Sequence, residues 1–408
     1  MSKLLKNSGW SLLAQGGKVI TQAGLFVLLA RGFGVHDFGL YMAIFSISQL
    51  LYPFSGLGTH NTMVMRVSRC PRLLPVYFWT PLVSTIFMGL GAAAVLSPFI
   101  SSMYTTSIVA VALILLTELV AYRLLDLATH AWQSMENLRS GAFAYLSISV
   151  GRLLLAACLF LSDHLTLVIW AVGNFGLTLL VAIYNLQKMT RKYAIKCQYF
   201  VFYPREIRRG IYFSLSGGSQ AVNANIDKIV LSRLGGLSDL GVYSAAYRVI
   251  QMGLLPMMAI FQATYPRYFK AGRAGLKPAL AVSRSVAMPL LVYGIVASAG
   301  IALLAPFAPW VLGGEYKPAI FLIQLLAPLP LLQIGHYLLG EAMTGAGLQR
   351  QRALIQIGAG GASLFLNILL ISLFGVVGAV VAALVCEVLL IVGYSIIVKN
   401  RLVRHQCF

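Results

Sequence analysis

The sequence predicts an all-α polytopic membrane protein. About twelve transmembrane helices form two parallel six-helix repeats, which make two lobes around a central cleft. Three observations predict this class: an apolar composition, basic residues that alternate between successive loops, and a stretch of sequence that occurs twice. Of 408 residues, 59% are hydrophobic and 10% are charged, and the mean hydropathy is +0.82, whereas soluble domains are about a quarter charged. At roughly 20 apolar residues per span, the length accommodates about twelve spans.

Long apolar stretches, separated by charged or Gly/Pro-rich joints, define the expected helices. The first one follows Lys3 and Lys6, as a signal peptide would. It is longer than a signal peptide, lacks a convincing cleavage site and is followed by further spans, so we expect it to be retained. The expected spans are 9–30, 39–63, 76–98, 107–131, 141–161, 165–187, 210–232, 240–264, 283–304, 318–340, 353–373 and 376–398.

Basic residues fix the expected orientation of these helices. With the N-terminus in the cytoplasm, 23 of the 31 Lys and Arg residues fall in cytoplasmic segments, and three lie in outer loops. This is the bias that orients membrane proteins, and it explains the net charge of +20 better than nucleic-acid binding does. We therefore expect both termini to be cytoplasmic and no nucleic-acid partner. The three outer basic residues are Arg31, Arg233 and Lys317.

The repeated stretch indicates a duplicated six-helix unit. LLARGFGVHDFGLY at 28–41 and VLSRLGGLSDLGVY at 230–243 are identical at six of fourteen positions. The basic joint 188–209 separates an N-terminal lobe, 1–187, from a C-terminal lobe, 210–408. Six is an even number, so both halves enter the membrane in the same orientation, as parallel repeats do.

Four matched pairs predict that the repeated stretch is an outer hairpin between the first two helices of each half. The glycines suit the left-handed turn that ends a helix, and the aspartates suit the N-cap of the next helix. The arginines face the negative end of the first helix, and the tyrosines suit the membrane interface. A gating role for the arginines, at the outer rim of the cleft, is the alternative. The pairs are Gly34/Gly236, Asp37/Asp239, Arg31/Arg233 and Tyr41/Tyr243.

Polar residues recur at helical spacing in the first two helices of each half, so they share helix faces. A hydrated cleft lined by these helices would explain them, and hydrogen bonds in a dry bundle are the alternative. The charge balance of the predicted cleft is cationic, with Asp227 opposed by basic residues and expected to pair with Arg248. The candidate cleft residues are Gln15, Lys18, Gln22, Gln49, Gln220, Asn223, Asp227, Lys228, Arg248 and Gln251.

Acidic residues elsewhere in the spans have different expected roles. Glu118 and Arg152 fall at similar depths, which favours internal ion pairing with Asp126 and Arg123 nearby. Glu387 has no obvious basic partner among its sequence neighbours, so it is either protonated in place or a proton-coupling site.

The sequence carries no signature of a metal site, a cofactor or an ATPase. No outer loop contains a cysteine, no CxxC occurs, and the six histidines have no ligand spacing. GAGGAS at 358–363 lacks the Lys-Ser/Thr of a phosphate loop. We expect no cofactor, and transport that draws on a gradient, on the membrane potential or on removal of the substrate.

Several segments, in this order, resemble the polysaccharide transporter branch of the multidrug/oligosaccharidyl-lipid/polysaccharide flippases, above all the Wzx-type O-antigen and repeat-unit flippases. The segments are FGVHDFGLY, GLGTHNTMVMR, NANIDKIVLSRLGGLSDLGVYSAAYRV, YPRYFK, LLGGEYKPA, GEAMTGAGLQRQR and LFGVVGAVVAALV. The resemblance implies alternating access and a multi-pass protein of the bacterial inner membrane. It implies a substrate of undecaprenyl-pyrophosphate-linked repeat units, with polysaccharide polymerase or export machinery as a further partner. The expected cationic cleft suits a pyrophosphate.

Three other functions are open. A cation-coupled drug antiporter of the same superfamily would have an acidic cleft, and Lys18 replaces the acidic residue that such an exporter would carry in its first helix. A membrane polymerase, ligase or transferase would carry a long outer loop with catalytic acids, whereas the expected outer joints are short, so we expect no enzyme. An unrelated twelve-helix carrier would have its usual basic signature between its second and third helices, and the joint there, RVSRCPR at 66–72, lacks it. The sequence names neither the sugar nor the energy source.

Overall fold

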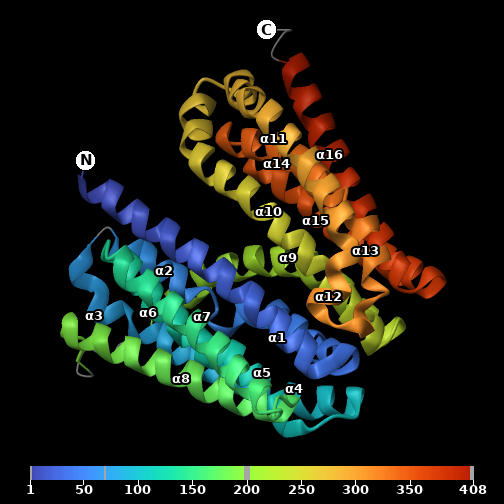
Figure 1. The fold of residues 1–408 in the computed structure, drawn as a ribbon. Helices are drawn as coiled ribbons and strands as arrows, with labels where there is room; N and C mark the ends of the chain where they lie inside the picture. Colours follow the sequence, from blue (N-terminus) through green and yellow to red (C-terminus); the bar gives the residue numbers. More distant parts are fainter. Residues whose placement is uncertain (1, 69, 197–202, 405–408) are drawn as a thin grey trace. The chain divides into compact units, whose positions relative to one another are not determined.

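The computed structural model describes residues 2–68, 70–196 and 203–404, and the backbone of these residues is helical almost throughout (Figure 1). No strand occurs in this part of the chain. Residue contacts divide the chain into two compact units, Met1–Asn225 and Ile226–Phe408, here called the N-terminal and C-terminal units. The boundary between them lies inside one helix, α9.

The N-terminal unit begins with α1, in which two helices meet at a kink at the non-helical Gly34. It covers the first expected span and most of the second. Later spans are interrupted by short irregular turns, including one turn of π-helix, η2, between α5 and α6. The elements are α1 Ser2–Ser55, α2 Thr59–Val67, η1 Pro71–Leu73, α3 Leu74–Tyr77, α4 Trp79–Tyr104, α5 Ile108–Leu116, η2 Thr117–Tyr122, α6 Arg123–Ser134, α7 Leu138–Leu161 and α8 Leu167–Lys192.

The C-terminal part of the chain also consists mainly of long helices, with several short ones between α11 and α14. Helix α9 begins in the N-terminal unit and ends in the C-terminal unit. The elements are α9 Pro204–Leu234, α10 Leu237–Gly272, α11 Leu276–Leu304, η4 Ala305–Phe307, α12 Ala308–Leu312, η5 Gly314–Tyr316, α13 Ala319–Leu326, α14 Leu329–Gly345, α15 Gln349–Phe374 and α16 Val376–Arg404.

The predicted all-α membrane class is confirmed. In the described part of the chain, ten helical stretches are long and apolar enough to cross a membrane. One of them, Ile20–Ser55, contains parts of two expected spans, and α9 is too polar to be among the ten. When the two spans in this stretch are counted separately and α9 is added, the helices agree with the expected count of about twelve. The predicted lobes 1–187 and 210–408, with 188–209 as a linker, stay a prediction.

The duplicated hairpin takes a conformation that only glycine adopts readily. Gly34 has φ 70° and ψ 177°, and Gly236 has φ 97° and ψ 166°. Both torsion pairs lie outside the left-handed helical region, in the region that is essentially restricted to glycine. The predicted positive φ of these two glycines is therefore confirmed. The predicted left-handed helical turn is wrong, because their ψ angles are extended.

The aspartates and one tyrosine of the hairpin differ from expectation. Gly236, not Asp239, is the N-cap of α10, and Asp239 lies in the first turn, where its charge still suits the positive end of the helix. Asp37 lies three residues after the non-helical Gly34, at the place in α1 that matches Asp239 in α10. Tyr243 is fully buried and donates a hydrogen bond to Asp227 over 2.7 Å. The prediction that Tyr243 belongs to the membrane interface is therefore wrong, because its hydroxyl satisfies a buried carboxylate.

The first half of α9 packs against other helices of the N-terminal unit. Glu206 Oε1 accepts hydrogen bonds from Arg66 Nη2 and Arg209 Nη1, each over 2.9 Å. Ser214 Oγ donates to the carbonyl of Pro53 over 2.7 Å. A side chain at Gly210 would collide with the carbonyl oxygen of Leu57. This half of α9 is thus fixed to α1 and α2 by charge and by close backbone packing.

Candidate functional site

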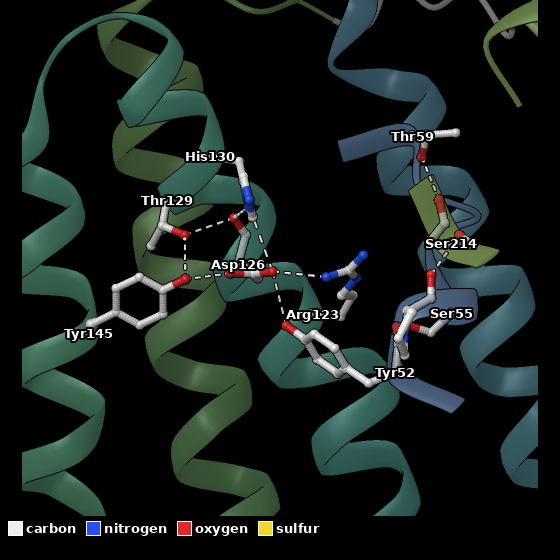
Figure 2. A network of polar contacts seen from close by, with 11 residues as sticks. Tyr52, Ser55, Thr59, Arg123, Asp126, Thr129, His130, Tyr145 and Ser214 are labelled. Atoms are coloured by element: carbon white, nitrogen blue, oxygen red, sulfur yellow. Dashed lines mark hydrogen bonds and ion pairs between the residues drawn. The ribbon is translucent and has the colours of Figure 1, made fainter. Parts of the chain in front are cut away.

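The most connected polar group in the N-terminal unit surrounds the Asp126 carboxylate (Figure 2). Its Oδ2 atom accepts hydrogen bonds from Arg123 Nη1 and from Tyr52 Oη, each over 2.9 Å. Its Oδ1 atom accepts a hydrogen bond from Tyr145, whose hydroxyl accepts one from Thr129 over 3.0 Å. The carboxylate is therefore surrounded by donors from three helices.

Helical spacing places these groups together. Arg123, Asp126 and His130 lie three and four residues apart on α6, so they share one face. His130 Nδ1 lies 2.9 Å from the backbone carbonyl of Asp126 and 3.6 Å from its Oδ2 atom. Tyr52 approaches from the end of α1 and Tyr145 from α7, as Figure 2 shows.

A second group lies about two turns earlier, around Glu118 in η2. Glu118 Oε1 accepts a hydrogen bond from Arg152 Nη2 over 3.3 Å, and Oε2 accepts one from Gln49 Nε2 over 3.2 Å. Arg152 also donates to Thr178 Oγ1 over 3.3 Å, and Thr178 donates to Asn174. The expected ion pair between Glu118 and Arg152 is confirmed.

Both groups are buried and nearly balanced in charge. Two carboxylates, Glu118 and Asp126, face two guanidinium groups, and all four side chains are largely inaccessible to solvent. The Arg123 guanidinium also lies 4.5 Å from the ring centre of Tyr52, and that of Arg152 lies 5.1 Å from Tyr122. Burying charges is costly unless they are paired and hydrogen-bonded, and ionisable groups within membrane helices commonly mark functional positions.

His60 lies beside this network without a hydrogen-bond partner in the described part of the chain. The residue is fully buried, and its ring centre is 6.0 Å from that of His130. Sequence reasoning treated the histidines as scattered, because His60 and His130 are distant in sequence and meet only when α2 packs on α6.

The C-terminal unit contains its own buried carboxylate at the start of the repeat. Asp227 Oδ1 lies 3.2 Å from Lys228 Nζ, and Tyr243 donates to Asp227 Oδ2. The Lys228 ammonium also lies 4.5 Å from the ring centre of Tyr247. Arg248 Nη1 donates to Gln251 Oε1 over 3.1 Å. The expected pairing of Asp227 with Arg248 is therefore replaced by pairing with Lys228, the next residue in the chain.

Two further polar groups join α14 to its neighbours. Glu387 on α16 accepts a hydrogen bond from Gln333 Nε2 over 2.9 Å, and its Oε2 atom lies 2.5 Å from His336 Nδ1. Arg352 on α15 lies 3.3 Å from Glu341 Oε1 and also donates to Thr344. These contacts supply the partner of Glu387 that sequence neighbours did not reveal.

Comparison with known proteins identifies the family. Residues 4–271 match the model of a family described as polysaccharide biosynthesis protein. The chain belongs to this polysaccharide biosynthesis protein family. It is 26% identical over 340 residues to the succinoglycan biosynthesis transport protein ExoT of Rhizobium meliloti (strain 1021). The alignment covers 79% of this chain and 65% of ExoT, so the chain spans about two thirds of that relative's length.

Solved structures show that this member of the polysaccharide biosynthesis protein family has the fold of the MOP superfamily transporters. An inward-facing multidrug resistance MATE transporter matches with a TM-score of 0.75 and 15% identity, over 97% of this chain and 95% of that one. A MOP superfamily transporter from Pyrococcus furiosus, described by a reversed polarity of its binding pocket, matches with a TM-score of 0.61 and 15% identity, over 97% and 94%. The chain is thus a multi-pass membrane protein of the polysaccharide biosynthesis protein family with the fold of the MOP superfamily transporters.

The predicted cleft residues of this family member differ in how exposed they are and in what they bind within their own units. Gln49 is bonded to Glu118, whereas Gln220, Asn223 and Gln251 are exposed. Gln22 is half-buried, and the outer-rim residues Arg31 and Arg233 are exposed. The side chains of Gln15 and Lys18 lie outside the described residues. The central cleft itself, which these residues would share across the two halves, stays a prediction.

Sequence reasoning missed the tyrosines that complete the networks. Tyr52 and Tyr145 donate to Asp126, and Tyr243 donates to Asp227. Tyrosine within an apolar helix is a weak signal, because the same residue serves at membrane interfaces. In the described part of the chain, no group of three or more His, Cys, Asp or Glu residues is arranged to hold a metal ion.

Proposed function

We propose that this protein is a lipid-linked oligosaccharide flippase of the bacterial inner membrane. It moves undecaprenyl-pyrophosphate-linked polysaccharide repeat units from the inner to the outer leaflet by alternating access, with both termini in the cytoplasm. The observation that carries the proposal is the family match over residues 4–271, which joins a polysaccharide pathway to a chain with a transporter fold. A relative named as a succinoglycan transport protein supports the same reading.

The charges of the C-terminal unit support a substrate with an anionic headgroup. Arg248 is bonded to the exposed Gln251. Lys228 of α9, which is paired with Asp227, places its ammonium on the ring of Tyr247, the residue before Arg248. A guanidinium binds phosphate oxygens in a bidentate way, and the ammonium of Lys18 would supply a second cation. The protein then acts by electrostatic shielding of the headgroup while the prenyl chain stays in the bilayer. No covalent step is required, so the protein is a transporter and not an enzyme.

Flipping of a defined substrate tests the proposal. The purified protein is reconstituted into vesicles with a fluorescent undecaprenyl-pyrophosphate-linked oligosaccharide, and a membrane-impermeant quencher reports which leaflet the label occupies. A charged hydrogen bond contributes roughly 1.5–3 kcal/mol, so its loss should slow flipping about tenfold to a hundredfold. Lys18→Ala and Arg248→Ala should show this loss, and the exposed Arg284→Ala should not.

The alternatives give different results in the same vesicles. Transport of a cationic dye without movement of the oligosaccharide would identify a drug antiporter, and polymerisation or transfer of the sugar would identify an enzyme. Because Asp227 is paired with Lys228 and Tyr243, Asp227→Asn should not rescue Arg248→Gln. A rescue would show that Arg248 merely neutralises Asp227, and would remove it from the headgroup contact.

A further inference from the structure

The largely buried carboxylate of Glu387 is paired with a histidine, His336. Gln333 and His336 lie three residues apart on α14, so both face α16, where Glu387 lies. The 2.5 Å between His336 Nδ1 and Glu387 Oε2 requires a proton between the two atoms, and Gln333 donates to the other carboxylate oxygen. The side chains of His336 and Glu387 are only 12% and 13% exposed. The second ring nitrogen of His336 is left to take up a further proton.

The other buried acids of these helices have partners whose charge is fixed near neutral pH. Glu118 is paired with Arg152, Glu341 with Arg352, and Asp227 with Lys228. Asp126 has His130 at 3.6 Å, but it also has Arg123 at 2.9 Å, which already balances its charge. Asp37 is paired with His36, but both of those side chains are more than half exposed. Among the largely buried ion pairs of the described residues, only Glu387 is paired with histidine alone. Histidine is the side chain whose charge ordinarily changes between about pH 5 and 8.

The described groups around this pair are either ordinarily neutral or paired with an opposite charge. The ionisable side chains that act on Glu387 are Tyr247 of α10, Tyr337 of α14, and Cys386 and Tyr394 of α16. Tyrosine and cysteine are ordinarily neutral at pH 7. The nearest charged groups, Asp227 with Lys228 and Glu341 with Arg352, neutralise each other in pairs. Helix α13 has no charged residue, α11 has none after Arg284, and α15 has none after Arg352.

We propose that the His336–Glu387 pair is a proton-binding site that couples transport to the proton gradient. Without the extra proton the pair carries one negative charge, and with it the pair is an imidazolium–carboxylate ion pair with no net charge. The uncharged form is favoured in an apolar interior, because an uncompensated charge there is costly. Access of water to α14 and α16 would therefore release the proton, and exclusion of water would retain it. The coupling role rests on the proposed transport function, whereas proton binding itself rests only on the geometry of the pair.

Nuclear magnetic resonance on the protein without substrate tests proton binding directly. The full chain, labelled with 15N-histidine, is placed in lipid nanodiscs, and the signal that disappears in His336→Gln is assigned to His336. In the wild type this signal should move reversibly as the pH is changed, because uptake of a proton alters the ring nitrogens. In Glu387→Gln the loss of the anionic partner should lower its midpoint by at least one pH unit. Glu136→Gln, which removes an exposed acid of the N-terminal unit, should leave it unchanged.

Other outcomes would overturn the proposal. A His336 signal that stays constant from pH 5 to 9, or that titrates identically in Glu387→Gln, would show that the pair is a fixed structural contact. A signal that moves on addition of Na⁺ at constant pH would identify a metal-cation site instead. In vesicles, Glu387→Gln should flip the oligosaccharide equally with and without a pH gradient, while the wild type should be accelerated by one. If the wild type flips no oligosaccharide but His336 titrates as stated, the substrate assignment fails and the proton site stands.

Discussion

Arg152 Nη2 lies 3.3 Å from Glu118 Oε1, and this ion pair joins α7 to the π-helical turn η2 within the N-terminal unit. Both side chains are buried, and each has a further polar neighbour: Thr178 for the arginine and Gln49 for the glutamate. The pair therefore links four helical segments of this unit.

Removing one member of this pair should cost more stability than removing both. Arg152→Gln leaves the Glu118 carboxylate buried and unpaired, and breaking a buried pair in this way costs about 3–5 kcal/mol. The double variant Glu118→Gln with Arg152→Gln should recover most of that loss. The measurement is the free energy of unfolding in mixed micelles, with the exposed Arg191→Gln as the control. Equal losses in the single and double variants would show that the charge of Glu118 is satisfied without Arg152.

The hydroxyl of Tyr243 should contribute to folding through Asp227. Tyr243→Phe removes the 2.7 Å hydrogen bond to a buried carboxylate, which is worth roughly 1.5–3 kcal/mol. Tyr212→Phe removes a hydroxyl from a side chain that is 71% exposed and should have no effect. The same unfolding measurement compares the two variants. No loss in Tyr243→Phe would indicate that Lys228 alone satisfies Asp227.

The glycine of the repeated hairpin should not tolerate a side chain. Gly236 has φ 97° and ψ 166°, so Gly236→Ala should destabilise the protein by about 1–3 kcal/mol. Gly300 lies within α11, with no neighbouring atom near the position of an added methyl group. Gly300→Ala should therefore stabilise the helix by roughly 0.5–1 kcal/mol. Thermal unfolding should move in opposite directions for the two variants, and a shared direction would contradict the conformational argument.

Glu206 should hold the first turns of α9 on the N-terminal unit. Glu206→Gln weakens the hydrogen bonds from Arg66 and Arg209, so amide hydrogens at 206–212 should exchange about tenfold faster or more. Arg205→Gln changes an exposed neighbour and should leave the exchange unchanged. Unaltered exchange in Glu206→Gln would mean that the packing of Gly210 and Ser214 is sufficient without the charge.

Composition and periodicity were sufficient to predict the helices, because a span needs only a long apolar segment, and loop charge orients it. The pair of Glu118 with Arg152 was predictable because both residues lie at similar depths on adjacent spans. The partner of Glu387 was not predictable in the same way. His336 is 51 residues away, and which face of α14 meets α16 depends on packing.

Helical spacing also failed to predict the partner of Asp227, because tertiary contacts determine it. Asp227 lies beside Lys228 in sequence, yet adjacent residues on a helix do not usually face each other. The sequence therefore favoured Arg248 as its partner. The structure brings the long Lys228 side chain back to Asp227, with its ammonium on the ring of Tyr247. Aromatic neighbours of this kind cannot be found from charge patterns.

The π-helical turn Thr117–Tyr122 determines which way the two buried acids of the N-terminal unit point. In a regular helix, eight residues separate Glu118 from Asp126 by about 80° around the axis. A π turn holds one residue more than the α turn it replaces. The effective separation is then about seven residues, or roughly 20°, since each residue turns the helix by about 100°. Both acids consequently meet α1 on one side, where Gln49 and Tyr52 lie three residues apart. Deleting a single residue from this turn would preserve the apolar span and yet rotate one acid away from its partner, so chain length here is constrained as strictly as residue identity.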